Sequence, residues 1–322
     1  MPERPSVTRC YQNHHLDSTR WDAVVPRSGD IIVTTSYKSG TTWMQEILLH
    51  LLHGDRDPMP TVHDVSPWVD ARFHGPREAL VERLEAIEGR RFLKSHLPFD
   101  GLPYYPEARY VVVGRDARDV FMSLANHYGS YTESAYSAFN SPDRPGDPFP
   151  RCPDDLRTLW QDWISRGWFE WESEGYPMWS NLYHTQTYWN WRHLENLHFV
   201  HYNDMLADLE SEVRRLAAFC SLEPSDEAVA RTVEATTFAN VRKRVEATPE
   251  TEDLSKAFFE GGQRTFFHKG TNGRWRDLLT DEDLDLYEAA KTRVLEPECA
   301  KWLEMGGAVV VGQGSGPVQG VR

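Results

Sequence analysis

The chain has 322 residues, and its 49 acidic against 35 basic side chains leave a net charge of -14. This is the wrong overall sign for a protein that coats nucleic acid or an anionic membrane. The length allows a substantial core in one large α/β domain or two smaller ones, and excludes a disulfide-stapled mini-domain. No uninterrupted apolar run approaches the roughly 20 residues that a membrane-spanning helix needs. Any anionic ligand must therefore be held by a local arrangement of groups.

The cysteines and the N-terminal segment indicate a cytoplasmic protein. Cys10, Cys152, Cys220 and Cys299 are far apart and form no C-x-x-C pair, so neither a zinc site nor a disulfide framework is indicated. The first fifteen residues are polar and lack the apolar core of a secretory signal. We therefore expect cytoplasmic localisation and no integral membrane association.

The first strong structural signal is a strand, a short loop and a helix. Residues 30–35 are a β-branched run, a glycine-containing loop follows over 36–40, and apolar residues recur at helical spacing over 41–52. The loop places backbone N–H groups and Lys38 at a helix N-terminus, which favours an anion. Because Tyr37 and not glycine precedes Lys38, this is not a Walker A loop. A phosphate or sulfate cradle and an ordinary capped helix with an exposed lysine both remain open.

Three further apolar runs predict strands, at residues 91–94, 109–113 and 198–202. The strand at 109–113 precedes a helix that carries Val120 and Leu124. The strand at 198–202 precedes an amphipathic helix predicted over about 206–220. Continuously apolar strands that alternate with helices predict a doubly wound, mostly parallel sheet with helices on both faces. We expect one α/β domain over residues 1–305, with a P-loop-like arrangement, and a flexible tail over 306–322.

The stretch between the strands predicted at 109–113 and 198–202 has a different composition. Seven of the 12 tryptophans lie between residues 160 and 191, after a segment rich in Pro, Gly and Asp. Aromatic residues this dense either form a helical cap that packs on the sheet or line an apolar pocket. Both interpretations stay open, and we treat residues 128–191 as an insertion on the substrate side.

Six short motifs resemble those of one enzyme family. Residues 37–43 read YKSGTTW, similar to the YPKSGTTW loop of the cytosolic-type sulfotransferases, with Ser36-Tyr37 in place of Tyr-Pro. We expect this departure to affect the stiffness of the loop more than its contacts. Residues 94–98, KSHLP, resemble the family's KTHLP, and residues 115–123 resemble RNPKDVxxS.

The other three motifs lie toward the C-terminus. Residues 202–205 match YEDM, residues 236–238 match TSF, and residues 268–275 resemble RKGxxGDW with His268 in place of the first arginine. The six motifs occur in the family's order. The chain is therefore identified as a member of the sulfotransferases that use 3′-phosphoadenosine 5′-phosphosulfate (PAPS) and release 3′,5′-diphosphoadenosine (PAP), with no metal required.

The resemblance implies a role for each motif residue. His96 would be the general base, Lys38 would neutralise the leaving phosphate, and Lys94 would orient or stabilise the sulfuryl oxygens. The implied contacts to PAPS are Ser39, Gly40, Thr41 and Thr42 at the 5′-phosphate; Arg115, Ser123, His268, Lys269 and Gly270 at the 3′-phosphate; Trp43 and Phe238 stacked on adenine; and Tyr202 and Thr236 at the base edge. Arg118 lies within the same motif, but a solvated charge is an equally good interpretation.

The identity of the acceptor stays open. The aromatic stretch suits phenols, sterols, polyketides or a glycolipid, sulfated on a hydroxyl or, less favourably, an amine. Residues 276–285 resemble the family's dimerisation motif, except that Asp281 stands where valine is usual, so we expect either a monomer or a homodimer. A P-loop kinase and a non-catalytic nucleotide- or lipid-binding protein are the alternative functions.

Overall fold

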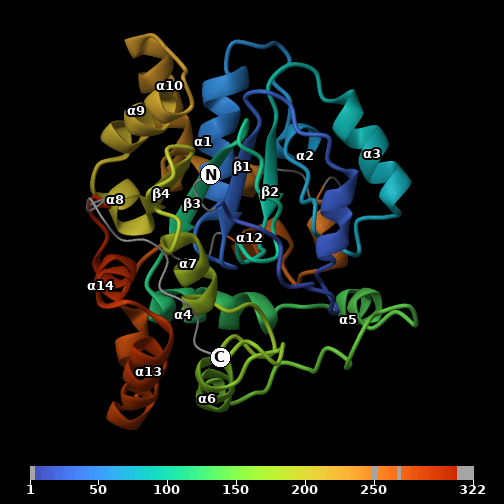
Figure 1. Ribbon diagram of the computed structural model, residues 1–322, viewed down its shortest axis with the longest axis vertical. Coiled ribbons are helices and arrows are strands. Elements are labelled where there is room, and N and C mark those ends of the chain that lie inside the picture. The colour runs from blue at the N-terminus through green and yellow to red at the C-terminus, as the bar shows by residue number, and fades with distance from the viewer. Residues whose placement is uncertain (1–3, 248–252, 267–269, 310–322) are drawn as a thin grey trace.

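A parallel sheet forms the centre of the protein (Figure 1). The computed structural model describes residues 4–247, 253–266 and 270–309. The strands are β1 (Ile31–Thr35), β2 (Phe92–Ser95), β3 (Arg109–Gly114) and β4 (Leu197–His201), all parallel in the order β2-β1-β3-β4. The predicted α/β class and the four predicted strands are confirmed.

The two faces of the sheet bury different side chains, because successive residues of a strand point to opposite faces. Ile31 belongs to an apolar cluster with residues of helix α1 (Thr41–His53), whereas Ile32 belongs to a second, larger cluster. Helix α10 (Asp226–Thr236) packs beside α1. In Figure 1, α1, α9 and α10 occupy the upper part of the view, and α4 and α6 lie below the sheet. Each strand of the sheet is thus covered on both faces, as its sequence predicts.

The remaining helices connect and surround these layers. They are α2 (Val62–Val65), α3 (Arg77–Ala86), α4 (Ala117–Tyr128), α5 (Glu133–Phe139), α6 (Leu156–Ser165), α7 (Leu182–Trp189), α8 (Tyr202–Ala207), α9 (Leu209–Phe219), α11 (Phe238–Ala247), α12 (Gln263–Phe266), α13 (Asp281–Val294) and α14 (Pro297–Met305), with short 3-10 helices at Ser18–Ala23, Leu254–Ala257 and Arg274–Asp277.

The helix predicted over about 206–220 is confirmed as α9 (Leu209–Phe219), which begins three residues later than expected because a separate helix, α8 (Tyr202–Ala207), ends just before it. Asp208 lies between α8 and α9 with an extended φ of -151°. Its carboxylate accepts hydrogen bonds from the backbone N–H and the hydroxyl of Ser211, and so caps the second helix. The apolar periodicity continues across this break, so the pattern did not reveal it.

Both interpretations of the tryptophan-rich segment hold, for different residues. Trp160 and Trp163 of α6 are fully buried, and the indole N–H of Trp160 donates to the carbonyl of Asp283 in α13. These two side chains build the core beneath the sheet. Trp179, in contrast, lies in the loop before α7 and reaches the candidate site described below.

Helix α14 ends near the predicted tail. Residues 306–309 are described, and the backbone N–H of Gly307 donates to the carboxylate of Asp204. Residues 310–322 of the predicted tail lie outside the described part of the chain. Within the described ranges, the helices are too short or too polar to cross a bilayer.

Candidate active site

The loop after β1 has a conformation that brings its backbone close to a ligand. Lys38 has a φ of 66° and Gly40 a φ of 118°, both in the left-handed region. The φ of Gly40 favours glycine, and a Cβ there would also lie 3.1 Å from the ring of Tyr202, a tight contact. Gly40 precedes α1 and has no side chain to cap it, which leaves the first turn suited to an anion.

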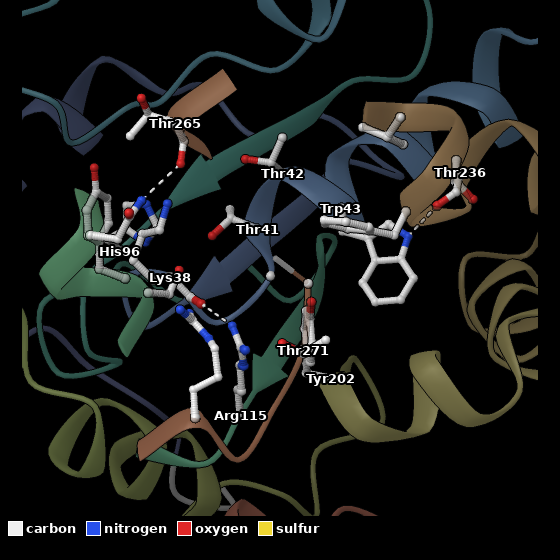
Figure 2. A pocket seen from close by; sticks show the side chains of 18 of the residues that line it. Lys38, Thr41, Thr42, Trp43, His96, Arg115, Tyr202, Thr236, Thr265 and Thr271 are labelled. Atoms are coloured by element: carbon white, nitrogen blue, oxygen red, sulfur yellow. Dashed lines mark hydrogen bonds between the residues drawn. The ribbon is translucent and has the colours of Figure 1, made fainter. Parts of the chain in front are cut away.

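Thirteen of the residues predicted to be catalytic or to contact PAPS line one cavity beside this loop (Figure 2). They are Lys38, Gly40, Thr41, Thr42, Trp43, Lys94, His96, Arg115, Ser123, Tyr202, Thr236, Phe238 and Gly270. Ser39 does not line it, because its buried hydroxyl lies 2.6 Å from that of Ser36. His268 and Lys269 lie outside the described residues.

His96 is held by its surroundings with one ring nitrogen free for chemistry. Its Nδ1 lies 2.8 Å from the carbonyl oxygen of Thr35, which can only accept, so Nδ1 carries the proton. Nε2 is then the basic nitrogen, and it is buried without a partner among the described residues. The edges of Tyr37 and Trp68 pack against the ring at centroid distances of 4.9 and 5.0 Å. Orientation and tautomer are both set before an acceptor arrives.

Burial, and for Lys38 and His96 also the neighbouring cations, lowers the pKa values of the basic groups that face this cavity. Burial, together with Lys94 and Arg115, lowers the pKa of Lys38 to about 7. Burial lowers the pKa of Lys94 to about 8, and its ammonium lies 4.3 Å from the ring centre of Trp68. Burial and the charge of Lys94 hold the pKa of His96 well below its usual value, so the imidazole is neutral. A polyanion bound here would relieve the repulsion among the cations.

Arg115 is a further cation of this cavity. Its guanidinium donates to the side-chain oxygen of Asn272 at 2.7 Å and to the carbonyl of Lys38 at 3.4 Å, the second drawn as a dashed line in Figure 2. It also stacks 4.1 Å from the ring centre of Tyr202. Neutral partners hold the side chain in place while its charge remains available to an anion.

Aromatic side chains form the wall beyond α1. The indole N–H of Trp43 donates to the carbonyl of Thr236 at 2.8 Å, and its ring meets Tyr202 edge to face. A Cβ on Gly270 would lie 2.7 Å from the ring of Phe238, so this backbone passes directly over that ring. The wall offers flat apolar surfaces of the kind on which a nucleobase stacks.

The sequence analysis missed six residues that line the cavity: Tyr37, Asn126, Val241, Thr265, Thr271 and Arg274. Thr271 and Arg274 lie within a quoted motif and could have been found there. The expectation for Tyr37 was wrong, because its ring stacks on Trp179 at 4.1 Å and its hydroxyl lies 2.7 Å from Nε2 of His127. Its side chain is part of the site, and its effect is not confined to loop stiffness.

Arg118 is neither solvated nor in the cavity. It pairs with Asp116 at 2.6 Å and lies 4.4 Å from the ring centre of Trp275 and 4.7 Å from that of Tyr287. Its role is to join α4 to the C-terminal helices.

A second, smaller cavity shares His96 with the first. Its free volume is about 10 Å³, room for one water molecule, against about 130 Å³ for the first cavity, so a bound acceptor has to widen it. The lining residues are Tyr11, Asn13, His14, Leu16, His96, Pro98, Trp168, Phe169, Glu172, Met178, Trp179 and Ser180. Part of this wall comes from the tryptophan-rich segment, as one of the two interpretations predicts. The N-terminal residues 11–16 were not predicted to contribute.

Comparisons with known proteins agree with this geometry. A family model described as the sulfotransferase domain matches residues 28–295. A glycolipid sulfotransferase of Mycobacterium bovis is 30% identical over 322 aligned residues, which cover 94% of this chain and 97% of the relative. Sulfotransferase 1B1 of Mus musculus is 24% identical over 81% of each chain.

Solved structures show the same fold. The crystal structure of mouse sulfotransferase SULT7A1 complexed with PAP has a TM-score of 0.62 at 18% identity, covering 88% of this chain and 92% of that one. Retinol dehydratase in complex with androsterone and the inactive cofactor PAP has a TM-score of 0.64 at 22% identity, covering 87% and 84%.

Proposed function

Since this chain belongs to the sulfotransferase family and is a sulfuryl-transferring enzyme, we propose that it moves the sulfuryl group of PAPS to a hydroxyl group of a hydrophobic acceptor, with His96 as the general base. Family membership decides against the two alternatives, a P-loop kinase and a non-catalytic binding protein. The observation that carries the proposal is the unpartnered Nε2 of His96, which lies in the wall shared by both cavities.

The larger cavity fits the donor. PAPS carries phosphate groups at the 5′ and 3′ positions of its ribose, and Lys38, Lys94 and Arg115 all line the cavity. The first turn of α1 and the flat rings of Trp43 and Phe238 line it as well. Lys38 and Lys94, whose pKa values are about 7 and about 8, become fully charged when an anion offsets their mutual repulsion.

The transfer step uses the two cavities together. The acceptor oxygen attacks sulfur and forms the new S–O bond while its proton passes to Nε2 of His96. The bond from sulfur to the 5′-phosphate oxygen breaks, and PAP leaves with the electron pair of that bond. Lys38 offsets the charge that develops on the leaving oxygen, and Lys94 that on the sulfuryl oxygens. This is positioning and electrostatic stabilisation of the kind that serves phosphoryl transfer.

The smaller cavity supports an apolar acceptor. Its rings come from Tyr11, Trp168, Phe169 and Trp179, and His96 is part of the same lining. The glycolipid sulfotransferase relatives and this aromatic lining together favour a glycolipid or a ring compound with a hydroxyl group. The resemblance to cytosolic-type enzymes supports a cytoplasmic location.

A transfer assay tests the proposal. The purified protein is incubated with PAPS labelled in the sulfuryl group, together with a simple phenol or an unmodified disaccharide, and the labelled product is quantified. We expect transfer to the phenol with a higher kcat/KM than to the disaccharide, and loss of transfer in His96→Ala. A clear preference for the disaccharide, or full activity of His96→Ala with several acceptors, would overturn the assignment.

A further inference from the structure

Glu172 is a carboxyl group in an otherwise aromatic cavity, and the fold does not account for it. Among the described residues that line the smaller cavity, Glu172 alone is acidic. Its carboxyl oxygens accept from the backbone N–H of Phe169 at 3.4 Å and from the hydroxyl of Ser180 at 3.3 Å, both long for hydrogen bonds. Within the described ranges it makes no ion pair. It therefore keeps capacity for a further partner.

Glu174, close by in the sequence, is a buried glutamate with a structural role. Glu174 is fully buried, and its carboxyl oxygens accept from the backbone N–H groups of Asn181 and Tyr183 at 3.0 Å. It thereby caps the start of α7, and it does not line either cavity. The short, well-directed contacts of Glu174 explain its burial, whereas the weak contacts of Glu172 do not.

The carboxyl group of Glu172 is mostly protonated at neutral pH, because its pKa is raised. Burial, with the charges of Glu174 and Asp100, raises the pKa of Glu172 to about 8. Asp100 is engaged by the hydroxyls of Tyr11 and Tyr183. His14, which also lines the cavity, has its pKa lowered to about 3 by burial and is neutral. A protonated carboxyl both donates and accepts a hydrogen bond, and its natural partner is a hydroxyl, which does the same.

A second polar atom in this wall has no partner either. The indole N–H of Trp179 is buried and unpartnered among the described residues, and Trp179 stands close to His96, with ring centres 5.9 Å apart. A buried donor left without an acceptor is costly, so an oxygen of the bound molecule would satisfy it.

We propose that Glu172 is a specificity-determining residue of the smaller cavity, which binds a second hydroxyl group of the acceptor while the reacting hydroxyl lies at His96. The inference rests on the proposed function and narrows its substrate class. The preferred acceptor is a ring compound that carries hydroxyl groups at two separated positions. The rings of Trp168, Phe169 and Trp179 cover the apolar body of that molecule, and Glu172 distinguishes it from an acceptor with a purely apolar end.

Equilibrium binding to the protein–PAP complex tests the inference without turnover. The probes are para-(hydroxyethyl)phenol, para-ethylphenol and para-(aminoethyl)phenol, which share a reacting hydroxyl and differ at the far end. Titrations are followed by tryptophan fluorescence. In the wild type at pH 7 we expect the hydroxyethyl compound to bind about tenfold more tightly than the ethyl compound, as one neutral hydrogen bond allows.

Substitutions of Glu172, with a control at another buried acid, test whether the preference for the hydroxyethyl compound depends on Glu172. Glu172→Gln keeps a donor and an acceptor and should retain most of the tenfold preference, whereas Glu172→Leu should bind both compounds alike. Glu172→Met replaces the leucine variant if that chain fails to fold. Glu212→Gln, which changes a buried acid that lines neither cavity, is the matched control and should keep the preference.

The other outcomes overturn the inference in distinguishable ways. Tightest binding of the aminoethyl compound would mean that the cavity recognises a cation, and an unchanged preference in Glu172→Leu would mean that another group recognises the hydroxyl. Binding of PAP without any of the three phenols would refute this inference and leave the proposed donor site intact. Failure of the wild type to bind PAP would refute the proposed function and this inference with it.

Discussion

Binding of PAP should take up protons from solution at alkaline pH, because the free site contains lysines that are partly deprotonated. At pH 8, a pKa of about 7 leaves Lys38 about one tenth protonated, and a pKa of about 8 leaves Lys94 half protonated. A bound polyanion raises both pKa values and restores both charges. The uptake is then about 0.9 proton at Lys38 and about 0.5 at Lys94, or about 1.4 in all.

At lower pH the net number of protons taken up on PAP binding becomes smaller. At pH 6.5 both lysines are already mostly protonated, so they take up only about 0.3 proton. The two phosphate groups of PAP, with a second pKa near ~6, release about 0.5 proton when they bind among cations. Net uptake should therefore be close to zero or slightly negative at pH 6.5. By linkage, the dissociation constant should rise with pH near pH 8, by about 1.4 decades per pH unit.

Isothermal titration calorimetry measures this uptake directly. PAP is titrated into the protein at each pH in two buffers that differ in ionisation enthalpy, and the difference in observed heat gives the number of protons. In Lys38→Met the uptake at pH 8 should fall by about 0.9. Zero uptake at pH 8 would show that Lys38 and Lys94 are already protonated in the free protein. Equal uptake in the wild type and Lys38→Met would show that Lys38 does not take up the proton.

Four further predictions concern His96, the aromatic wall at Phe238, the core at Trp160, and His268, which stands where the family's motif has arginine. His96→Ala should lower kcat by about 10² to 10⁴ with little change in PAP affinity. Burial holds the pKa of His96 well below 6.5, so protonation of His96 should not lower the wild-type kcat until the pH is well below that value. A fall of kcat centred near pH 6.5 would contradict this. Gly270→Ala should weaken PAP binding, since its φ of 64° and a Cβ 2.7 Å from Phe238 force that ring to move, whereas unchanged affinity by calorimetry would show that the wall adjusts. Trp160→Ala should cost about 3–5 kcal/mol of unfolding free energy in urea melts, because the side chain is fully buried; a loss under 1 kcal/mol would place it outside the core. His268→Arg, outside the described residues, should tighten PAP binding more at pH 8 than at pH 6, because arginine stays charged where histidine does not, and an equal gain at the two pH values would exclude a titrating contact.

The amino-acid sequence by itself determined the sheet and the loops that carry the donor site. Apolar strand runs report burial on both faces directly, and the motif residues follow strand ends or helix starts, where a parallel sheet brings them to one edge. For this reason Lys38, His96 and Arg115, which lie far apart along the chain, could be assigned to one site before any coordinates were known.

Tertiary structure alone decided how side chains meet across elements. Tyr37 enters the site because Trp179, from a loop more than a hundred residues away, offers its ring a stacking partner. Arg118 leaves the site because Asp116 and the ring of Trp275 hold it elsewhere. Such contacts depend on packing between segments distant in sequence, which hydrophobic periodicity does not encode.

The smaller cavity, the proposed acceptor site, shows most clearly what only the tertiary structure decided. The sequence showed many tryptophans in one segment, but it could not tell the buried Trp160 from Trp179 at the site, since both lie among similar neighbours. Residues 11–16 carry no motif and reach the cavity only because the folded chain returns the N-terminus to the tryptophan-rich segment. The weakly bonded carboxyl of Glu172 became visible as a recognition group only when the partners of every buried oxygen could be counted.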